Sequence, residues 1–158
     1  MKRRPLALAA LLLGVVGAPA DLSAQEMSAA GYATYIQTGA TSTPLDDGRA
    51  RVDATIAGYV MTDDPTNPFH LVAQDCASTN LVAADGSVER SSGYCASRDA
   101  DGDMFWIWFW NSAEGGEWGL INGTGKFEGI TGGGTSEGVA ADPDGRFAIR
   151  WTGAWTMR

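Results

Sequence analysis

Apolar and polar side chains alternate along several segments of this chain, with the period of two that is typical of β-strands. Residues 147–156 are the clearest case, because Phe147, Ile149 and Trp151 fall on one face while Arg150 falls on the other. The same alternation predicts strands in three further segments: residues 32–37, 52–60 and 69–75. No stretch of about 11 or more residues keeps a helical apolar period, so the predicted fold class is all-β.

Residues that favour tight turns separate these segments. They occur at Asp46-Asp47-Gly48, Asp63-Asp64-Pro65, Asp85-Gly86, Asp101-Gly102 and Asp144-Gly145. Their regular spacing predicts a meander of about eight antiparallel strands. We expect a single antiparallel barrel in preference to a sandwich, because closure leaves no exposed sheet edge.

One predicted strand, residues 104–110, is apolar on both faces. Phe105, Ile107 and Phe109 share one face, and the other face carries tryptophans: Trp106, Trp108 and Trp110. Aromatic rings dominate many ligand sites and interfaces, so these tryptophans are candidate ligand-binding residues or an oligomer interface. Alternatively, a loop or a neighbouring subunit buries both faces. A lipid-facing strand is a third interpretation, although an outer-membrane barrel would repeat the pattern in every strand.

The N-terminal segment has the layout of a secretory signal peptide. A positively charged start precedes an apolar run over residues 6–17, which is too short to span a bilayer. Small residues predict cleavage after Ala24, with a competing site after Ala20. We therefore expect residues 1–24 to be a signal peptide and residues 25–158 to form one β-barrel domain. The protein would be secreted or periplasmic, without a membrane anchor.

Charge and cysteine content narrow the classes of partner. Residues 25–158 carry 8 basic and 18 acidic residues, a formal charge of −10, which argues against a nucleic-acid partner. Cys76 and Cys95 are the only cysteines of the sequence, and export predicts that they form one disulfide. A metal site would need more thiols or histidines than the chain has, since His70 is the only histidine. We expect no metal and no cofactor.

Two further segments are candidate sites for small charged ligands. The acidic cluster Asp99, Asp101 and Asp103 lacks EF-hand spacing, so we expect a hairpin turn with solvated carboxylates and keep a weak calcium site as the alternative. The glycine-rich segment 119–135 contains Gly125-Lys126, but Phe127 stands where a phosphate loop needs a serine or threonine. Nucleotide binding is therefore not expected.

Part of this segment, residues 122–132, reads Asn-Gly-Thr-Gly-Lys-Phe-Glu-Gly-Ile-Thr-Gly. It resembles the signature G-G-T-G-K-F-x-G-a-x-G of the allene oxide cyclase and dirigent proteins. The resemblance implies an eight-stranded barrel in which this stretch forms a turn between late strands. In such a turn the glycines supply positive φ and close backbone approach, and Phe127 plugs the barrel end.

The resemblance also implies an apolar cavity inside the barrel. One branch of the family cyclises an unsaturated oxylipin epoxide there, and the other controls the stereochemistry of phenoxy-radical coupling. No acidic or arginine pocket residue of either branch can be placed on this chain by motif, so the catalytic residues are unknown. We predict a non-catalytic exported barrel that binds a small apolar or aromatic ligand, or a protein partner. The alternatives are a cyclase-like or isomerase-like enzyme and a structural barrel that forms homo-oligomers.

Overall fold

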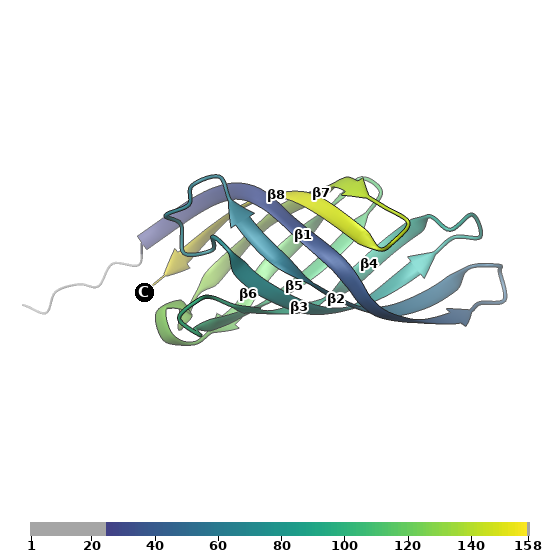
Figure 1. Cartoon of the computed structure of the whole chain (residues 1–158), viewed down its shortest axis with the longest axis horizontal. Helices are drawn as coiled ribbons and strands as arrows, with labels where there is room; N and C mark the ends of the chain where they lie inside the picture. The colour runs from purple at the N-terminus through teal and green to yellow at the C-terminus, as the bar shows by residue number, and fades with distance from the viewer. Residues whose placement is uncertain (1–24, 158) are drawn as a thin grey trace, which may run out of the picture.

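The computed structural model describes residues 25–157, which form eight strands in one closed antiparallel barrel (Figure 1). The strands follow one another around the barrel in chain order, and β8 pairs with β1 to close it. Their bounds are β1 Gln25–Pro44, β2 Ala50–Thr62, β3 Val72–Val82, β4 Val88–Arg98, β5 Met104–Ser112, β6 Gly115–Gly123, β7 Thr131–Ala141 and β8 Arg146–Met157, with a short 3-10 helix η1 Gly125–Phe127 between β6 and β7. The predicted all-β antiparallel barrel is confirmed. The predicted signal peptide, residues 1–24, lies outside the described residues.

Five of the seven connections between the strands of residues 25–157 form where turn residues predicted them, whereas the β5–β6 connection carries none of those markers. Four of them contain a glycine with positive φ, the conformation that tight turns require: Gly48, Gly86, Gly102 and Gly145. One predicted strand starts later than expected, because Asn67 to Leu71 fold into a turn and β3 begins at Val72. No helix in this part of the chain is long and apolar enough to cross a membrane.

One end of the barrel is filled by aromatic rings. Phe69 stacks between Trp155 and Phe105, with ring centroids 4.3 and 4.7 Å away. Phe127 of η1 meets Phe105 edge-on at 4.9 Å and is 0% exposed. Phe69 comes from the β2–β3 connection and Phe127 from the β6–β7 connection, so two connections fold inward at the end where β1 begins and β8 ends (Figure 1). Phe127 therefore plugs this end, as the sequence predicted.

An ionic cluster on the outside fixes the plug in place. Lys126 Nζ lies 2.6 Å from Asp99 Oδ2 and 2.8 Å from Asp101 Oδ2. The backbone N–H of Lys126 also donates to Asp103 Oδ2 at 3.1 Å. The β4–β5 turn thus uses its carboxylates to hold η1. The expected turn is present, although two of its carboxylates are paired with Lys126.

The pairing of Asp99 makes the stability of the plug depend on pH. Burial of the Asp99 carboxyl raises its pKa, but hydrogen bonds from Lys126 and from the backbone N–H of Asp103 outweigh this and lower the pKa on balance. A carboxyl whose pKa is lower in the folded state contributes stability above its unfolded pKa of about 3.9 and loses it as the pH falls through the folded value. At about pH 7 we expect Asp99→Asn to be less stable than the wild type. On acidification to about pH 3 we expect its melting temperature to fall less than that of the wild type, because the variant has no carboxyl at this position to protonate.

Thermal unfolding of the wild type and of Asp99→Asn at both pH values tests this expectation. Asp144→Asn is the matched control, because the Asp144 side chain is 79% exposed at the opposite end of the barrel. If acid lowers the melting temperature of Asp99→Asn as much as that of the wild type, the pairing with Lys126 does not contribute to acid sensitivity.

Candidate functional site

The half of the barrel away from the aromatic plug is hollow. It encloses a cavity of about 880 Å³, which lies within the range of about 300–1,000 Å³ that is usual for small-molecule sites. Apolar side chains form most of its wall, among them Val52, Ile56, Ile107, Phe109 and Ile149. Its mouth is formed by the connections β3–β4, β5–β6 and β7–β8. The fold therefore presents one deep apolar chamber that is open at one end.

Aromatic rings in this chamber lie against the wall because glycines on other strands, one or two places around the barrel, leave room for them. In each case a side chain at the glycine would collide with the ring. The pairs are Tyr35 with Gly58, Phe109 with Gly93 and Trp118 with Gly153, in which a Cβ on the glycine would lie 2.6, 2.8 and 2.3 Å from the nearest ring atom. Each ring thus fills space at the wall and leaves the centre of the barrel open.

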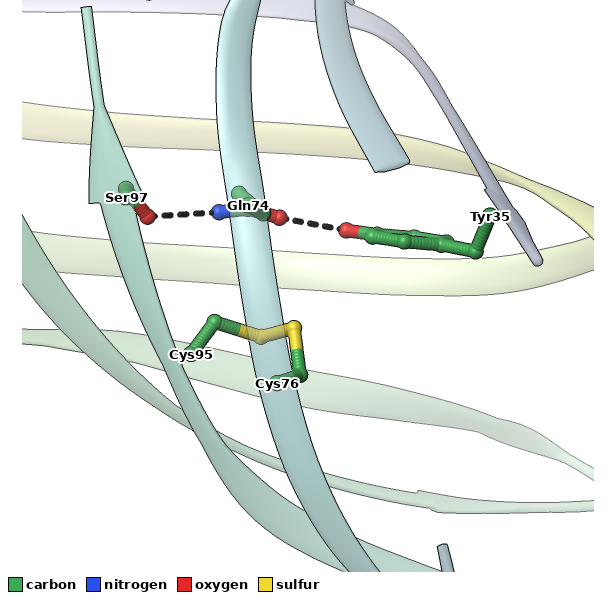
Figure 2. Close-up of a disulfide and its surroundings, with 5 residues drawn as sticks. All are labelled: Tyr35, Gln74, Cys76, Cys95 and Ser97. Atoms are coloured by element: carbon green, nitrogen blue, oxygen red, sulfur yellow. Dashed lines mark hydrogen bonds between the residues drawn. A yellow bond between two sulfur atoms is a disulfide. The ribbon is translucent and has the colours of Figure 1, made fainter. Parts of the chain in front are cut away.

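A chain of hydrogen bonds crosses the inner wall at mid-height (Figure 2). The strand register places Tyr35, Gly58, Gln74 and Ser97 in one row across β1 to β4. Because Gly58 has no side chain, the Tyr35 hydroxyl reaches Gln74 and donates to Oε1 at 2.5 Å. The Gln74 amide in turn donates to Ser97 Oγ at 2.9 Å. Burial raises the pKa of Tyr35, so the phenol keeps its proton and remains a donor.

The disulfide lies in the next row of the same wall. Cys76 and Cys95 face each other on β3 and β4, and their sulfur atoms are bonded at 2.02 Å (Figure 2). The predicted disulfide is therefore confirmed, and both residues line the cavity. A second polar pair lies across the cavity, where Ser136 Oγ donates to Asn111 Oδ1 at 2.9 Å.

Charge is confined to the mouth of the cavity. Among the described residues that line it, only Asp142 and Arg146 carry charge, and their side chains form an ion pair at 3.5 Å. The deeper wall offers neutral hydroxyl and amide groups. An anionic ligand in this chamber would lie far from an unpaired positive group, which makes its burial costly.

The predicted tryptophans lie on the outside of the barrel. Phe105, Ile107 and Phe109 point inward from β5, so the strand places the tryptophans on the outer face: Trp106, Trp108 and Trp110. Trp108 and Trp110 are 37% and 40% exposed and line a separate outer groove, whereas Trp106 is half-buried and lines neither space. Their role in ligand binding or in homo-oligomer formation stays a prediction.

Sequence reasoning missed the polar residues that the interior brings together. Gln74 and Ser97 are 3% and 0% exposed, and no motif surrounds them. The signal for Gln74 was its position two residues after Val72 and two before Cys76, on the inward-facing side of a strand. In an alternating strand, a polar residue at an inward position marks a buried hydrogen-bonding site.

Comparisons with known proteins relate the fold to one group of barrels. No family model matches the sequence, and no curated protein gives a significant match. A solved structure, the pterocarpan synthase dirigent protein GePTS1, has a TM-score of 0.53 at 14% identity, covering 95% of this chain and 97% of that chain. The pterocarpan synthase dirigent protein PsPTS1 has a TM-score of 0.49 at 14% identity, covering 84% and 96%.

At this level of identity the likeness establishes the fold alone. The chain has the eight-stranded barrel architecture found in dirigent proteins. The resemblance of residues 122–132 to the allene oxide cyclase and dirigent signature stays a prediction.

Proposed function

We propose that this chain is an exported barrel that holds a small, neutral, apolar or aromatic ligand in the open half of its interior. The observation that carries the proposal is the cavity of about 880 Å³, closed at one end by Phe69 and Phe105 of the aromatic plug and open at the other. When a ligand binds, the apolar wall of the chamber and the apolar surface of the ligand are both removed from water. The burial of this apolar surface is the main driving force for association.

The polar groups of the wall restrict which ligands fit. Tyr35 and Gln74 line the cavity, and their hydroxyl and amide groups retain capacity for a further hydrogen bond beyond the one that joins them. A ligand with one or two neutral polar substituents, such as a phenol, would use that capacity. A carboxylate would not, because the cationic Arg146 is already paired with Asp142 at the mouth.

Export forms part of the same proposal. The segment before Gln25 has the charge and hydropathy of a signal peptide, and the bond between Cys76 and Cys95 is of the kind that persists in oxidising compartments. A secreted or periplasmic barrel with an apolar chamber is suited to carry or sequester a poorly soluble molecule outside the cytosol.

The proposal predicts that filling the cavity abolishes ligand binding. Gly138 lies in the cavity wall on β7, and a Cβ added there meets no atom within 4 Å. We expect Gly138→Trp to place an indole ring in the chamber without displacing its neighbours. Calorimetric titration with 2-naphthol should give saturable binding by the wild type, and Gly138→Trp should weaken it about tenfold or more, equivalent to about 1.4 kcal/mol.

Glu137→Trp is the matched control, because Glu137 pairs with Arg150 across the outer face of β7 and β8. It adds the same ring outside the barrel and should leave the affinity unchanged. A second ligand, 2-naphthoate, has a similar shape but carries a negative charge, and we expect it to bind more weakly than 2-naphthol. Equal loss of binding in both variants, or tighter binding of the anion, would contradict the proposal.

The same protein preparation separates binding from catalysis. Native mass spectrometry of the barrel purified from its own host would reveal a retained ligand as added mass. If incubation with the protein instead converts the ligand into a released product of different mass or structure, the cyclase-like or isomerase-like alternative replaces the binding role.

A further inference from the structure

A second concave site lies on the outer surface of the barrel, on the wall formed by β1 to β5. It is an open groove of about 860 Å³, and the side chains that form its two sides point away from the barrel interior. Three residues line both this groove and the inner cavity: Ala54, Ser78 and Phe109. Short side chains form its floor, among them Ala77, Thr79 and Ser92. One side of the groove is aromatic and the other is polar.

The aromatic side consists of three rings with exposed faces. Tyr94 of β4 lies directly opposite Trp108 of β5, and Trp110 is two residues further along β5. These rings are 65%, 37% and 40% exposed. The sheet holds the indoles in fixed positions, because Trp108 occupies the space above Gly119 and Trp110 Nε1 donates to Glu117 Oε2 at 3.3 Å.

The polar side consists of hydroxyl groups around one oriented carboxylate. Thr79 Oγ1 donates to Asp53 Oδ1 at 2.7 Å, and Arg51 pairs with Asp53 Oδ2 at 3.0 Å. Thr41 and Thr55 line the same side. Each carboxylate oxygen can accept a further hydrogen bond, so Asp53 remains available to hydroxyl donors from a ligand.

We propose that this groove binds a neutral oligosaccharide. A pyranose ring has an apolar C–H face and an edge of hydroxyl groups. The aromatic side of the groove matches the C–H face, and the polar side matches the hydroxyl groups. The C–H faces would stack on Tyr94 and Trp108, and the hydroxyl groups would donate to Asp53 and exchange hydrogen bonds with Thr79. The distance from β2 to β5 is three strand spacings, about 14 Å, which exceeds a single sugar ring.

The charges around the groove select against acidic glycans. Asp53 is neutralised by Arg51, and Glu117 lies beside Trp110 without an offsetting cation in the groove lining that the structure describes. Residues 25–158 also carry a formal charge of −10. A polyanionic sugar chain would therefore meet repulsion, whereas a neutral chain would not.

Affinity electrophoresis and calorimetry with cellopentaose, xylopentaose and mannopentaose test the proposal, with oligogalacturonate as the anionic counterpart. We expect the full mature chain to bind at least one of the neutral glycans and not the oligogalacturonate. Trp108→Ala and Tyr94→Ala should each weaken that binding about tenfold or more, equivalent to about 1.4 kcal/mol. Asp53→Asn should weaken it with the rings intact.

Trp106→Ala is the matched control, because Trp106 is an outer-face tryptophan of the same strand that does not line the groove. It should leave glycan affinity unchanged, and thermal unfolding of each variant checks that the barrel is folded. The proposal is overturned if no neutral glycan binds, or if Trp106→Ala weakens binding as much as Trp108→Ala. It is also overturned if Trp108→Ala changes only the sedimentation behaviour, because the rings would then serve contact between copies of the chain.

Discussion

Replacement of Phe127 by alanine should lower the free energy of unfolding by about 3–5 kcal/mol, the range for a large aromatic side chain removed from a packed core. The ring is 0% exposed and contacts Phe69 and Phe105, which come from separate parts of the chain. Its loss would leave a void that these rings fill only in part. Chemical denaturation followed by tryptophan fluorescence would measure the change.

Phe147→Ala is the control for this prediction, because it removes the same ring from the open half of the barrel. Phe147 packs against Tyr35 in a tilted arrangement with ring centroids 5.1 Å apart, but it lines the cavity and is only half-buried. It should cost less than half as much as Phe127→Ala. Equal losses would mean that the plug contributes no more than any wall residue.

Removal of the disulfide is the second large expected effect. The bond joins residues 19 apart in sequence, and closure of a loop of this size stabilises a protein by about 3 kcal/mol on the loop-entropy model. We expect the double variant Cys76→Ala and Cys95→Ala to lose about this amount. The β3–β4 hairpin should still form, because Gln74 and Ser97 hold the same two strands together next to the disulfide.

A reducing agent offers an independent measurement of the same contribution. Thermal unfolding in excess phosphine should lower the melting temperature of the wild type and leave that of the double variant unchanged. A fall of equal size in both proteins would show that the reductant acts elsewhere.

The strand order and the turns followed from the sequence because their signals are local. An alternating segment such as residues 147–156 exposes one face to water and buries the other, and β8 spans Arg146–Met157 as a result. Aspartate-glycine pairs define turns by the backbone conformation that glycine alone adopts readily. These two signals are enough to predict the number and direction of strands in a meander, and hence the barrel.

The glycine-rich segment was harder to predict because its strands lack the usual alternation. Of residues 122–132, which were expected to form a turn, only 124–130 do so, since β6 extends to Gly123 and β7 begins at Thr131. Gly133 and Gly134 lie inside β7, where any side chain would approach the backbone of β6 or β8 within 2.4 Å. Glycines that allow close strand approach carry no periodic pattern, so the sequence did not predict a strand here.

The functional site was harder to predict than the strands, because the alternation of side chains along a strand separates two faces without indicating which face points into the barrel. Both faces of β5 are aromatic, and neighbouring strands decide between them. Phe105 packs on Phe69 and Phe127 inside, whereas Gly119 on β6 leaves space for Trp108 outside. These partners lie up to 36 residues away in sequence, and no local pattern links them to β5.

The pairing of β1 with β8 has a consequence for how the chain reaches this fold. It joins residues 25–36 to residues 146–157, which makes it the strand pair most distant in sequence. The seven hairpins can assemble locally, but the ring of strands completes only when the whole chain is present. Folding dominated by such distant pairings takes about milliseconds to seconds in small β-proteins. Until that step both terminal strands offer unpaired edges, and the interval before closure is when the chain is most prone to aggregate.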